Sequence, residues 1–330
     1  MRLNYIFFAL LSILQVAPAS AALSKGDKSP KIAGYINGRA IRNGLVGPNQ
    51  IAKVDWVYLA GIQPNSETGG FFHDDTGYTK ADGRIFISYD EFKSTLKAAK
   101  GLGKPTSIMV GGAGSHAAFE AIAASPLRDT FIFKARDFCL EMGLDGIDID
   151  YEHPKSEEKV KLMEGFYKRC YEVWKPAGLR VSAAFSARRS MSLDLAQKVH
   201  PYVDTFNFMT YGAPAQNLKN YVTTFRELGI PDEKVVLGVA FFGKGSVKGV
   251  KYEVPYNKLA QVKGFNPVKS NVEFNHPKAG NMDVNYTNQA EMKKIVQVSG
   301  ELGVAGIMFW EMGSDVPITD AASLLKSLTE

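Results

Sequence analysis

Residues 144–154 of this 330-residue chain read LDGIDIDYEHP, so acidic residues alternate with apolar ones. Side chains alternate between the two faces of a strand, which places Asp148, Asp150 and Glu152 on one face and Ile147 and Ile149 on the other. Successive acids are then about 6.6 Å apart along the strand. The pattern predicts a buried strand with one apolar face and one face of acidic residues that are candidates for a functional site.

Crowding like charges on one face is unfavourable, because two carboxylates about 4 Å apart repel by about 4 kcal/mol at an effective dielectric near 20. We therefore expect at least one of the three acids to hold a proton. The alternatives are a solvated acidic edge and a calcium loop. Strict alternation with apolar residues argues against the first, and the Asp-Gly spacing does not follow an EF-hand. Asp145 is out of phase with the other acids and is expected to support the strand.

On either side of this strand, short apolar or β-branched runs alternate with longer amphipathic stretches. The runs predict eight strands, at residues 32–36, 54–60, 106–110, 146–150, 180–185, 205–209, 235–240 and 304–310. Helices are predicted between them, for example at 89–102, with Ser88 as N-cap and Gly103 past the end, and at 156–174. Eight such units predict an α/β fold, a closed (β/α)8 TIM barrel, whose chemistry lies at the C-terminal strand ends.

Residues 243–287 interrupt this rhythm, because they are rich in Gly, Pro, Asn and Lys and show no clear helix. We expect a short excursion between the seventh strand and the last helix rather than a second domain. Residues 22–330 are thus predicted to form one catalytic barrel.

The N-terminus has the pattern of a secretory leader. Arg2 is followed by an apolar run from Tyr5 to Val16 and then by small residues, which predicts a signal peptide over residues 1–21. The run is too short to span about 30 Å of hydrocarbon. We expect a secreted protein, extracellular or periplasmic, with no membrane contact after cleavage. Export permits a Cys139–Cys170 disulfide, but both cysteines fall in helix-like sequence, where buried free thiols fit equally well.

Composition excludes several classes of protein. The chain is 45% hydrophobic and 22% charged, as expected for a globular protein, and its formal net charge is only +5. Basic residues do not cluster, so no nucleic-acid partner is expected. Two cysteines and five scattered histidines give no metal-ligand spacing, and we expect no cofactor and no metal. His153 lies on the phase opposite to Glu152 and is expected to cap the following loop.

Asp145, Asp148, Asp150 and Glu152 together resemble the signature of glycoside hydrolase family 18, the chitinases and related endo-β-N-acetylglucosaminidases. The resemblance extends along the other predicted strands, at Gly34-Tyr35 and at 109–112 (MVGG), 209–211 (MTY), 241–244 (FFGK) and 306–310 (GIMFW). It covers nearly the whole of residues 22–330.

The resemblance implies a retaining, substrate-assisted mechanism, an exception among glycosidases. Glu152 would be the general acid and then the general base. The nucleophile would be the substrate's own 2-acetamido oxygen, which forms an oxazolinium ion. Asp150 would share a proton with Glu152 and then turn to the acetamide N–H, beside Asp148. Tyr211 would hydrogen-bond the acetamide oxygen and hold it near the anomeric carbon.

The resemblance also implies a sugar-binding surface in which Trp310 stacks on a sugar ring. Further substrate contacts are expected from Met209, Tyr35, Gly111 and Gly112. Some positions depart from the family: Gly212 replaces the usual Asp, Met109 a Ser, and Phe242 and Lys244 a Tyr and an Arg. The short excursion implies an open groove and endo-type cleavage.

The leading functional hypothesis is a secreted enzyme that cleaves β-1,4 bonds of N-acetylglucosamine polymers, chiefly chitin or chito-oligosaccharides. One alternative is a non-catalytic chitin-binding lectin on the same barrel. Such lectins commonly lose the terminal Glu, so the presence of Glu152 favours the enzyme, whereas Gly212 keeps the lectin open. Another alternative is an endo-β-N-acetylglucosaminidase acting on N-glycans or peptidoglycan. The oligomeric state is not predicted.

Overall fold

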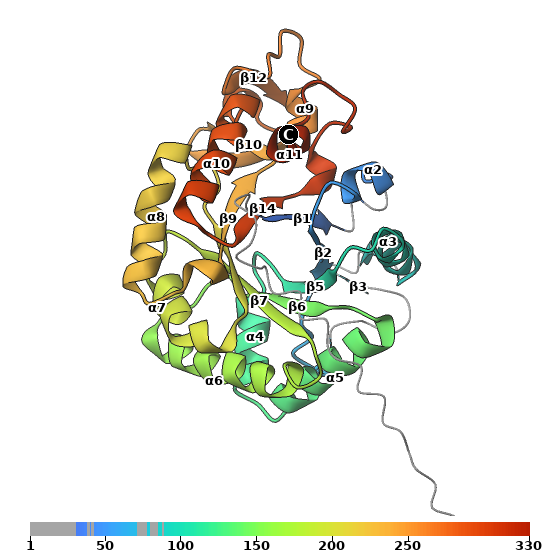
Figure 1. Cartoon of the computed structure of the whole chain (residues 1–330), viewed down its shortest axis with the longest axis vertical. Helices are drawn as coiled ribbons and strands as arrows, with labels where there is room; N and C mark the ends of the chain where they lie inside the picture. Colours follow the sequence, from blue (N-terminus) through green and yellow to red (C-terminus); the bar gives the residue numbers. More distant parts are fainter. Residues whose placement is uncertain (1–30, 38–39, 41–42, 71–77, 80–84, 88) are drawn as a thin grey trace, which may run out of the picture.

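The computed structural model describes residues 31–330 except 38–39, 41–42, 71–77, 80–84 and 88. The predicted signal peptide and the predicted N-cap Ser88 lie outside the described residues. Eight parallel strands close into a barrel (Figure 1). Around the barrel they follow in the order β1 (Lys31–Asn37), β14 (Gly306–Trp310), β9 (Val235–Ala240), β8 (Thr205–Met209), β7 (Arg180–Ser186), β6 (Gly146–Asp150), β5 (Thr106–Gly111) and β2 (Trp56–Ile62). The predicted (β/α)8 TIM barrel is confirmed.

The predicted strand ends agree with the observed ones to within two residues, and the largest shifts have local causes. Residues 54–60 were expected as a strand, but β2 starts at Trp56 because Asp55 uses its carboxylate to accept the backbone N–H of Ile32 at 2.9 Å. Strand β14 starts at Gly306 rather than residue 304, since the N–H of Ala305 bonds the carbonyls of Asp232 and Val235.

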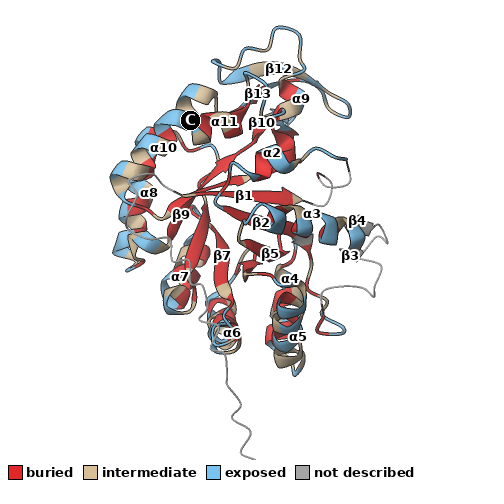
Figure 2. Cartoon of the chain, turned by 45° about the vertical axis from the view of Figure 1, so that its right-hand side comes forward, coloured by how far each residue is buried: buried red, intermediate tan, exposed pale blue. Residues whose placement is uncertain are grey.

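Helices cover the outside of the barrel, and Figure 2 shows buried strands surrounded by helices that expose their outer faces. The α-helices are α2 (Pro48–Ile51), α3 (Tyr89–Gly101), α4 (His116–Ala123), α5 (Leu127–Met142), α6 (Glu157–Trp174), α7 (Ser190–Val199), α8 (Ala215–Glu227), α9 (Tyr256–Leu259), α10 (Gln289–Leu302) and α11 (Leu324–Thr329). The described residues also form three short 3₁₀ helices, η2 (His200–Tyr202), η3 (Asp232–Lys234) and η4 (Met312–Ser314).

Helix α6 shows how the sequence specifies these helices. Its first turn is capped by Ser156, whose hydroxyl accepts the N–H of Lys159 at 3.3 Å. Its buried residues recur at spacings of three and four, which places one apolar face against the barrel; they are Val160, Met163, Phe166, Tyr167, Cys170 and Trp174. Cys139 and Cys170 are both buried free thiols, and burial raises the pKa of each.

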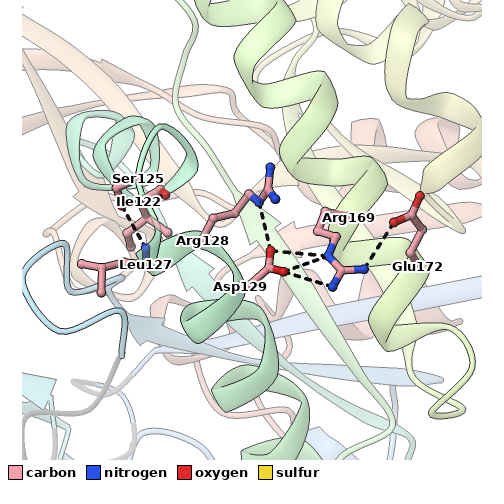
Figure 3. Close-up of polar contacts among 7 residues, drawn as sticks. All are labelled: Ile122, Ser125, Leu127, Arg128, Asp129, Arg169 and Glu172. Carbon is pink, nitrogen blue, oxygen red and sulfur yellow. Dashed lines mark hydrogen bonds and ion pairs between the residues drawn. The ribbon is translucent and has the colours of Figure 1, made fainter.

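Helices α5 and α6 are joined on their outer side by an ion network around Asp129 (Figure 3). Asp129 accepts hydrogen bonds from Nε of Arg128 at 3.0 Å and Nη2 of Arg169 at 3.1 Å, and Arg169 also reaches Glu172 at 3.5 Å. The hydrogen bond from Arg169 is the main cause of a lowered pKa at Asp129. The network is solvent-exposed, so it orients the two helices but adds little to stability.

The apolar core has two parts. The larger part fills the space between the barrel and its helices. The smaller part lies inside the barrel and contains the aromatic side chains of Tyr35, Trp56 and Tyr58, with Tyr35 stacked on Tyr58 at a ring-centroid distance of 4.7 Å. Met209, Tyr211 and Trp310 pack on this inner cluster and are half-buried.

The excursion lies where the sequence places it, but it is more regular than expected. Between β9 and α10 it forms a four-stranded antiparallel sheet with the order β11 (Val250–Pro255), β10 (Phe242–Val247), β13 (Gly280–Asn285) and β12 (Asn271–His276). Figure 1 shows it at the top, near α9 and α11. The sequence pattern that indicates a strand here is the alternation in β12, where exposed Asn and Glu residues separate the half-buried Val272 and Phe274. Polar residues with low strand propensity obscured it.

A second, two-stranded sheet pairs β3 (Tyr78–Thr79) with β4 (Ile85–Ile87). In the part of the chain that the structure describes, no helix is both long and apolar enough to cross a membrane.

Candidate active site

The three acids of residues 148–152 lie at and beyond the C-terminal end of β6, inside the barrel. Their exposure increases along the chain: Asp148 is 0% exposed, Asp150 6% and Glu152 23%. Ile147 and Ile149 point the other way, into the outer core. The alternation read from the sequence therefore produces a row of carboxyl groups from the barrel interior to its open end.

Asp148 is held by donors from three other strands. Its Oδ1 accepts the Ser182 hydroxyl at 2.6 Å and Nδ2 of Asn207 at 3.1 Å, and its Oδ2 accepts the Tyr35 hydroxyl at 2.7 Å. Asn207 also donates to the Tyr35 oxygen at 2.7 Å. Burial raises the pKa of Asp148 to about 6, although the three donors oppose this shift.

Asp150 is in a different situation from Asp148. Its Oδ1 is buried and has no hydrogen-bond partner among the described residues. Burial raises its pKa well above the ordinary value, and the charges of Glu152 and Asp148 raise it further. Burial and the neighbouring carboxylates therefore favour the neutral form of Asp150.

Gly111 and Gly112 hold the backbone of Asp150. Both have a positive φ, of 111° and 108°, which favours glycine. A Cβ on Gly111 would overlap the carbonyl oxygen of Asp150, and the N–H of Gly112 donates to that oxygen at 2.8 Å. The Ser115 hydroxyl donates to it as well, at 3.1 Å. These glycines thus support the Asp150 backbone, and their contact with substrate stays a prediction.

Two predicted sugar-contacting side chains lie at the ends of β14 and β8, the strands on either side of β9. Trp310 ends β14 and lies 5.5 Å from Tyr35 between ring centroids, tilted by 54°. Tyr211 follows β8, and burial and the charges of Asp150, Glu152 and Asp148 raise its pKa. Its hydroxyl therefore lies within the field of the acids, and it contacts the Met308 sulfur at 3.8 Å. Tyr35 is only 2% exposed, so the structure gives it a supporting contact with Asp148.

Asp145 lies at the other end of β6, away from the acid row. Its Oδ2 accepts the N–H of Thr106 on β5 at 2.8 Å and also the ammonium of Lys100 at 2.8 Å. The carboxylate thus ties β6 to β5 and α3, which agrees with the expected supporting role. Within the described ranges, no group of three or more His, Cys, Asp or Glu side chains is arranged to hold a metal ion.

Comparison with known proteins adds independent information. The sequence profile of glycosyl hydrolases family 18 matches residues 31–315. The chain belongs to glycosyl hydrolases family 18. A class V chitinase from Medicago truncatula is 26% identical over 286 residues, which cover 69% of this chain and 74% of the relative. The family 18 protein described here is a chitinase-like glycoside hydrolase.

Solved structures share the family 18 barrel. A chitinase from Bacteroides thetaiotaomicron superimposes with a TM-score of 0.73 at 17% identity, covering 91% of this chain and 96% of the other. The Group IV chitinase of Ostrinia furnacalis in complex with allosamidin gives a TM-score of 0.70 at 20% identity, covering 91% and 97%. At these identities the likeness establishes the fold.

The departures from the family 18 pattern have local explanations. Gly212 has a φ of 74°, a left-handed conformation that disfavours the usual Asp. Met109 is 2% exposed and packs in the inner cluster, so the hydroxyls on Asp148 come from Tyr35 and Ser182 instead of residue 109.

Sequence reasoning missed several residues of this family 18 site. Ser182 and Asn207 are polar residues on the inward phase of β7 and β8, so the alternation used for the acids could have identified them. His153 was expected to cap a loop, but its Nε2 lies 3.2 Å from Oε2 of Glu152. No sequence pattern indicates that contact, because the chain leaves the strand after Asp150 and alternation ends there.

Proposed function

We propose that this protein is a secreted, retaining, endo-acting hydrolase of β-1,4-linked N-acetylglucosamine polymers, chiefly chitin, that uses the substrate's 2-acetamido group as nucleophile. The observation that carries the proposal is Asp150, whose pKa is raised and whose buried Oδ1 has no partner among the described residues. A carboxyl group whose neutral form is favoured and whose Oδ1 has no partner among the described residues, two residues from the half-buried Glu152, suits this chemistry.

In the first step, Glu152 gives its proton to the glycosidic oxygen while the acetamido oxygen attacks the anomeric carbon. The glycosidic bond breaks, and an oxazolinium ion forms. Asp150 turns towards the substrate so that its carboxyl accepts the acetamide N–H. This contact orients the nucleophile and stabilises the positive charge that develops on it. Asp148 is the negatively charged acid at the inner end of the row, and its hydrogen-bond donors hold it in place.

In the second step, a water molecule attacks the anomeric carbon from the face that the leaving group vacated. Glu152, now a carboxylate, takes a proton from this water, and the oxazolinium ring opens. Two displacements at the same carbon give net retention. Tyr211 donates to the acetamide oxygen in both steps, because its raised pKa keeps the phenol protonated. Trp310 supports the sugar ring by stacking.

Three observations support the choice of substrate and cleavage mode. The relative from Medicago truncatula is named a chitinase. The excursion is short and holds a single α-helix of four residues, α9, which favours an open groove and internal cleavage. Residues 1–21 have the composition of a secretory leader.

The test is product analysis of the purified protein on N-acetylglucosamine oligomers, an N-glycoprotein and peptidoglycan in parallel. We expect early products of several lengths from a hexamer, with the β-anomer at the new reducing end as followed by NMR. Early α-anomer would overturn the acetamido mechanism, and dimers alone released from one chain end would overturn endo action. Exclusive release of N-glycans or peptidoglycan fragments would overturn chitin as substrate.

A further inference from the structure

His153 follows Glu152 directly, and the two side chains meet. Nε2 of His153 lies 3.2 Å from Oε2 of Glu152, with 15% and 23% of the respective side chains exposed. Among the described residues, His153 is the one basic side chain within 4.0 Å of this carboxyl group. Nearby cations are engaged elsewhere: Lys155 contacts His116 at 3.0 Å, and Lys159 pairs with Glu120 at 3.2 Å.

The other ring nitrogen of His153 indicates how the ring is protonated. Nδ1 is buried and has no hydrogen-bond partner among the described residues. A proton on Nδ1 would be a buried donor without an acceptor, which is unfavourable. The neutral ring with its proton on Nε2 avoids this, and that nitrogen lies beside Oε2 of Glu152, although the N–H is not aligned for a hydrogen bond in this structure.

We propose that His153 is a positioning residue that determines which oxygen of Glu152 carries the acid proton. This inference rests on the proposed function. A carboxylic acid holds one proton, and the oxygen that accepts an N–H is the poorer place for it. With Oε2 facing His153, the proton of Glu152 sits on Oε1 and is available to the glycosidic oxygen.

The same contact serves the whole cycle without any proton leaving His153. When Oε1 gives its proton to the leaving group, negative charge develops on the carboxylate, and the N–H at Oε2 stabilises it. In the second step Oε1 takes a proton from water, and the acid is restored with the same orientation. The contact tightens as substrate enters, as catalytic hydrogen bonds commonly do.

Three variants test whether the side chain of residue 153 acts by donating a hydrogen bond or only by filling space. In His153→Gln the amide nitrogen can occupy nearly the place of Nε2, so the donor is kept. In His153→Asn the amide nitrogen lies near the place of Nδ1, and His153→Leu has no donor. We expect kcat on a chito-oligosaccharide to fall by about tenfold or more in the Leu and Asn variants with KM nearly unchanged, and by less than about threefold in the Gln variant.

A second substrate gives a readout that a purely structural role would not change. An aryl glycoside with a 4-methylumbelliferyl leaving group needs little protonation, so the loss in His153→Leu should be several-fold smaller on it than on the oligosaccharide. His200→Leu, at a histidine outside the site, is the matched control and should retain full activity. Thermal unfolding of each variant checks that the fold is intact.

Equal losses in the Leu and Gln variants, equal losses on both substrates, or no loss in His153→Leu would overturn the positioning role. Glu152→Gln in the same assay separates this result from the proposed function. If Glu152→Gln is inactive, those outcomes overturn the role of His153 alone. If Glu152→Gln keeps its turnover, both the proposed mechanism and the role of His153 are overturned.

Discussion

Asp145 and Asp148 lie three residues apart on the same stretch of chain, yet they occupy opposite environments. Asp145 is 40% exposed, pairs with Lys100 and accepts a backbone N–H. Asp148 is 0% exposed, forms no ion pair with a described basic residue, and relies on three neutral donors. The Asp145 carboxylate has a cationic partner at the surface. The buried Asp148 carboxylate has only neutral hydrogen-bond donors among the described residues, and these oppose the effect of burial.

The amino end of the barrel repeats the arrangement at Asp145. Asp55 accepts the N–H of Ile32 at 2.9 Å, and Asp204 accepts that of Val181 at 2.9 Å while pairing with Lys175 at 2.7 Å. Each of these carboxylates lies just before one barrel strand and accepts a backbone N–H at the start of the neighbouring strand. The amino end thus uses acids to hold strands together, whereas the carboxyl end buries acids that are ready to exchange protons.

The largest expected effect is at the open end of the acid row. Glu152→Gln should lower kcat by about 10³-fold, because general acid catalysis supplies about 10² to 10⁴ and this residue acts in both steps. KM and the unfolding midpoint should change little. Steady-state kinetics and thermal unfolding measure the two quantities. A variant with more than a tenth of the normal kcat would contradict the role of Glu152.

The buried acid Asp148 predicts a pH dependence of stability. The pKa of Asp148 is raised to about 6 in the folded protein, so between pH 4 and 6 the native state binds more protons than the unfolded state. The free energy of unfolding should therefore fall as pH rises through this window, by about 3 kcal/mol from Asp148, and Asp150, whose pKa is also raised, lowers it in the same direction.

Denaturant unfolding at a series of pH values tests this sign. Asp148→Asn should remove its share of the slope. Asp315, whose pKa burial also raises to about 6, contributes to the same window, so the difference between this variant and the natural protein is the quantity to compare. A slope that Asp148→Asn leaves intact would contradict the prediction.

At the amino end the expected loss is in stability alone. Asp145→Ala removes the acceptor for the Thr106 N–H and the partner of Lys100, and should cost about 1–2 kcal/mol in the free energy of unfolding. Asp145→Asn keeps an acceptor oxygen and should lose less. kcat should be unaffected in both, and a kcat loss without a stability loss would place Asp145 in the catalytic machinery.

The smallest effect is expected on the outer surface. Asp129→Ala breaks the network of Figure 3, yet the pairs are exposed and screened, so the unfolding midpoint should fall by less than about 2 °C. Activity should be unchanged. A larger fall, measured by thermal unfolding at low and at high salt, would show that this network does more than orient α5 and α6.

Prediction from sequence succeeded where a short stretch of chain shows a regular pattern of apolar residues that indicates a strand. The alternation in residues 146–150 and the apolar runs of the other strands located all eight barrel strands to within two residues. It failed where polar residues interrupt the pattern, as in β12 and β13, and where contacts join distant strands. Tyr35 and Asn207 are 172 residues apart, and no local pattern links them to each other or to Asp148.

The sequence by itself determined the barrel and the inward phase of the three acids, because these follow from the pattern of apolar residues and from strand geometry. Only the tertiary structure decided how the three acids differ in burial and in hydrogen-bond partners. Donors from β1, β7 and β8 converge on Asp148, Oδ1 of Asp150 has no partner among the described residues, and the loop after β6 brings His153 to Glu152. Burial and donor number are properties of the closed barrel, and they set the proton affinities of the row.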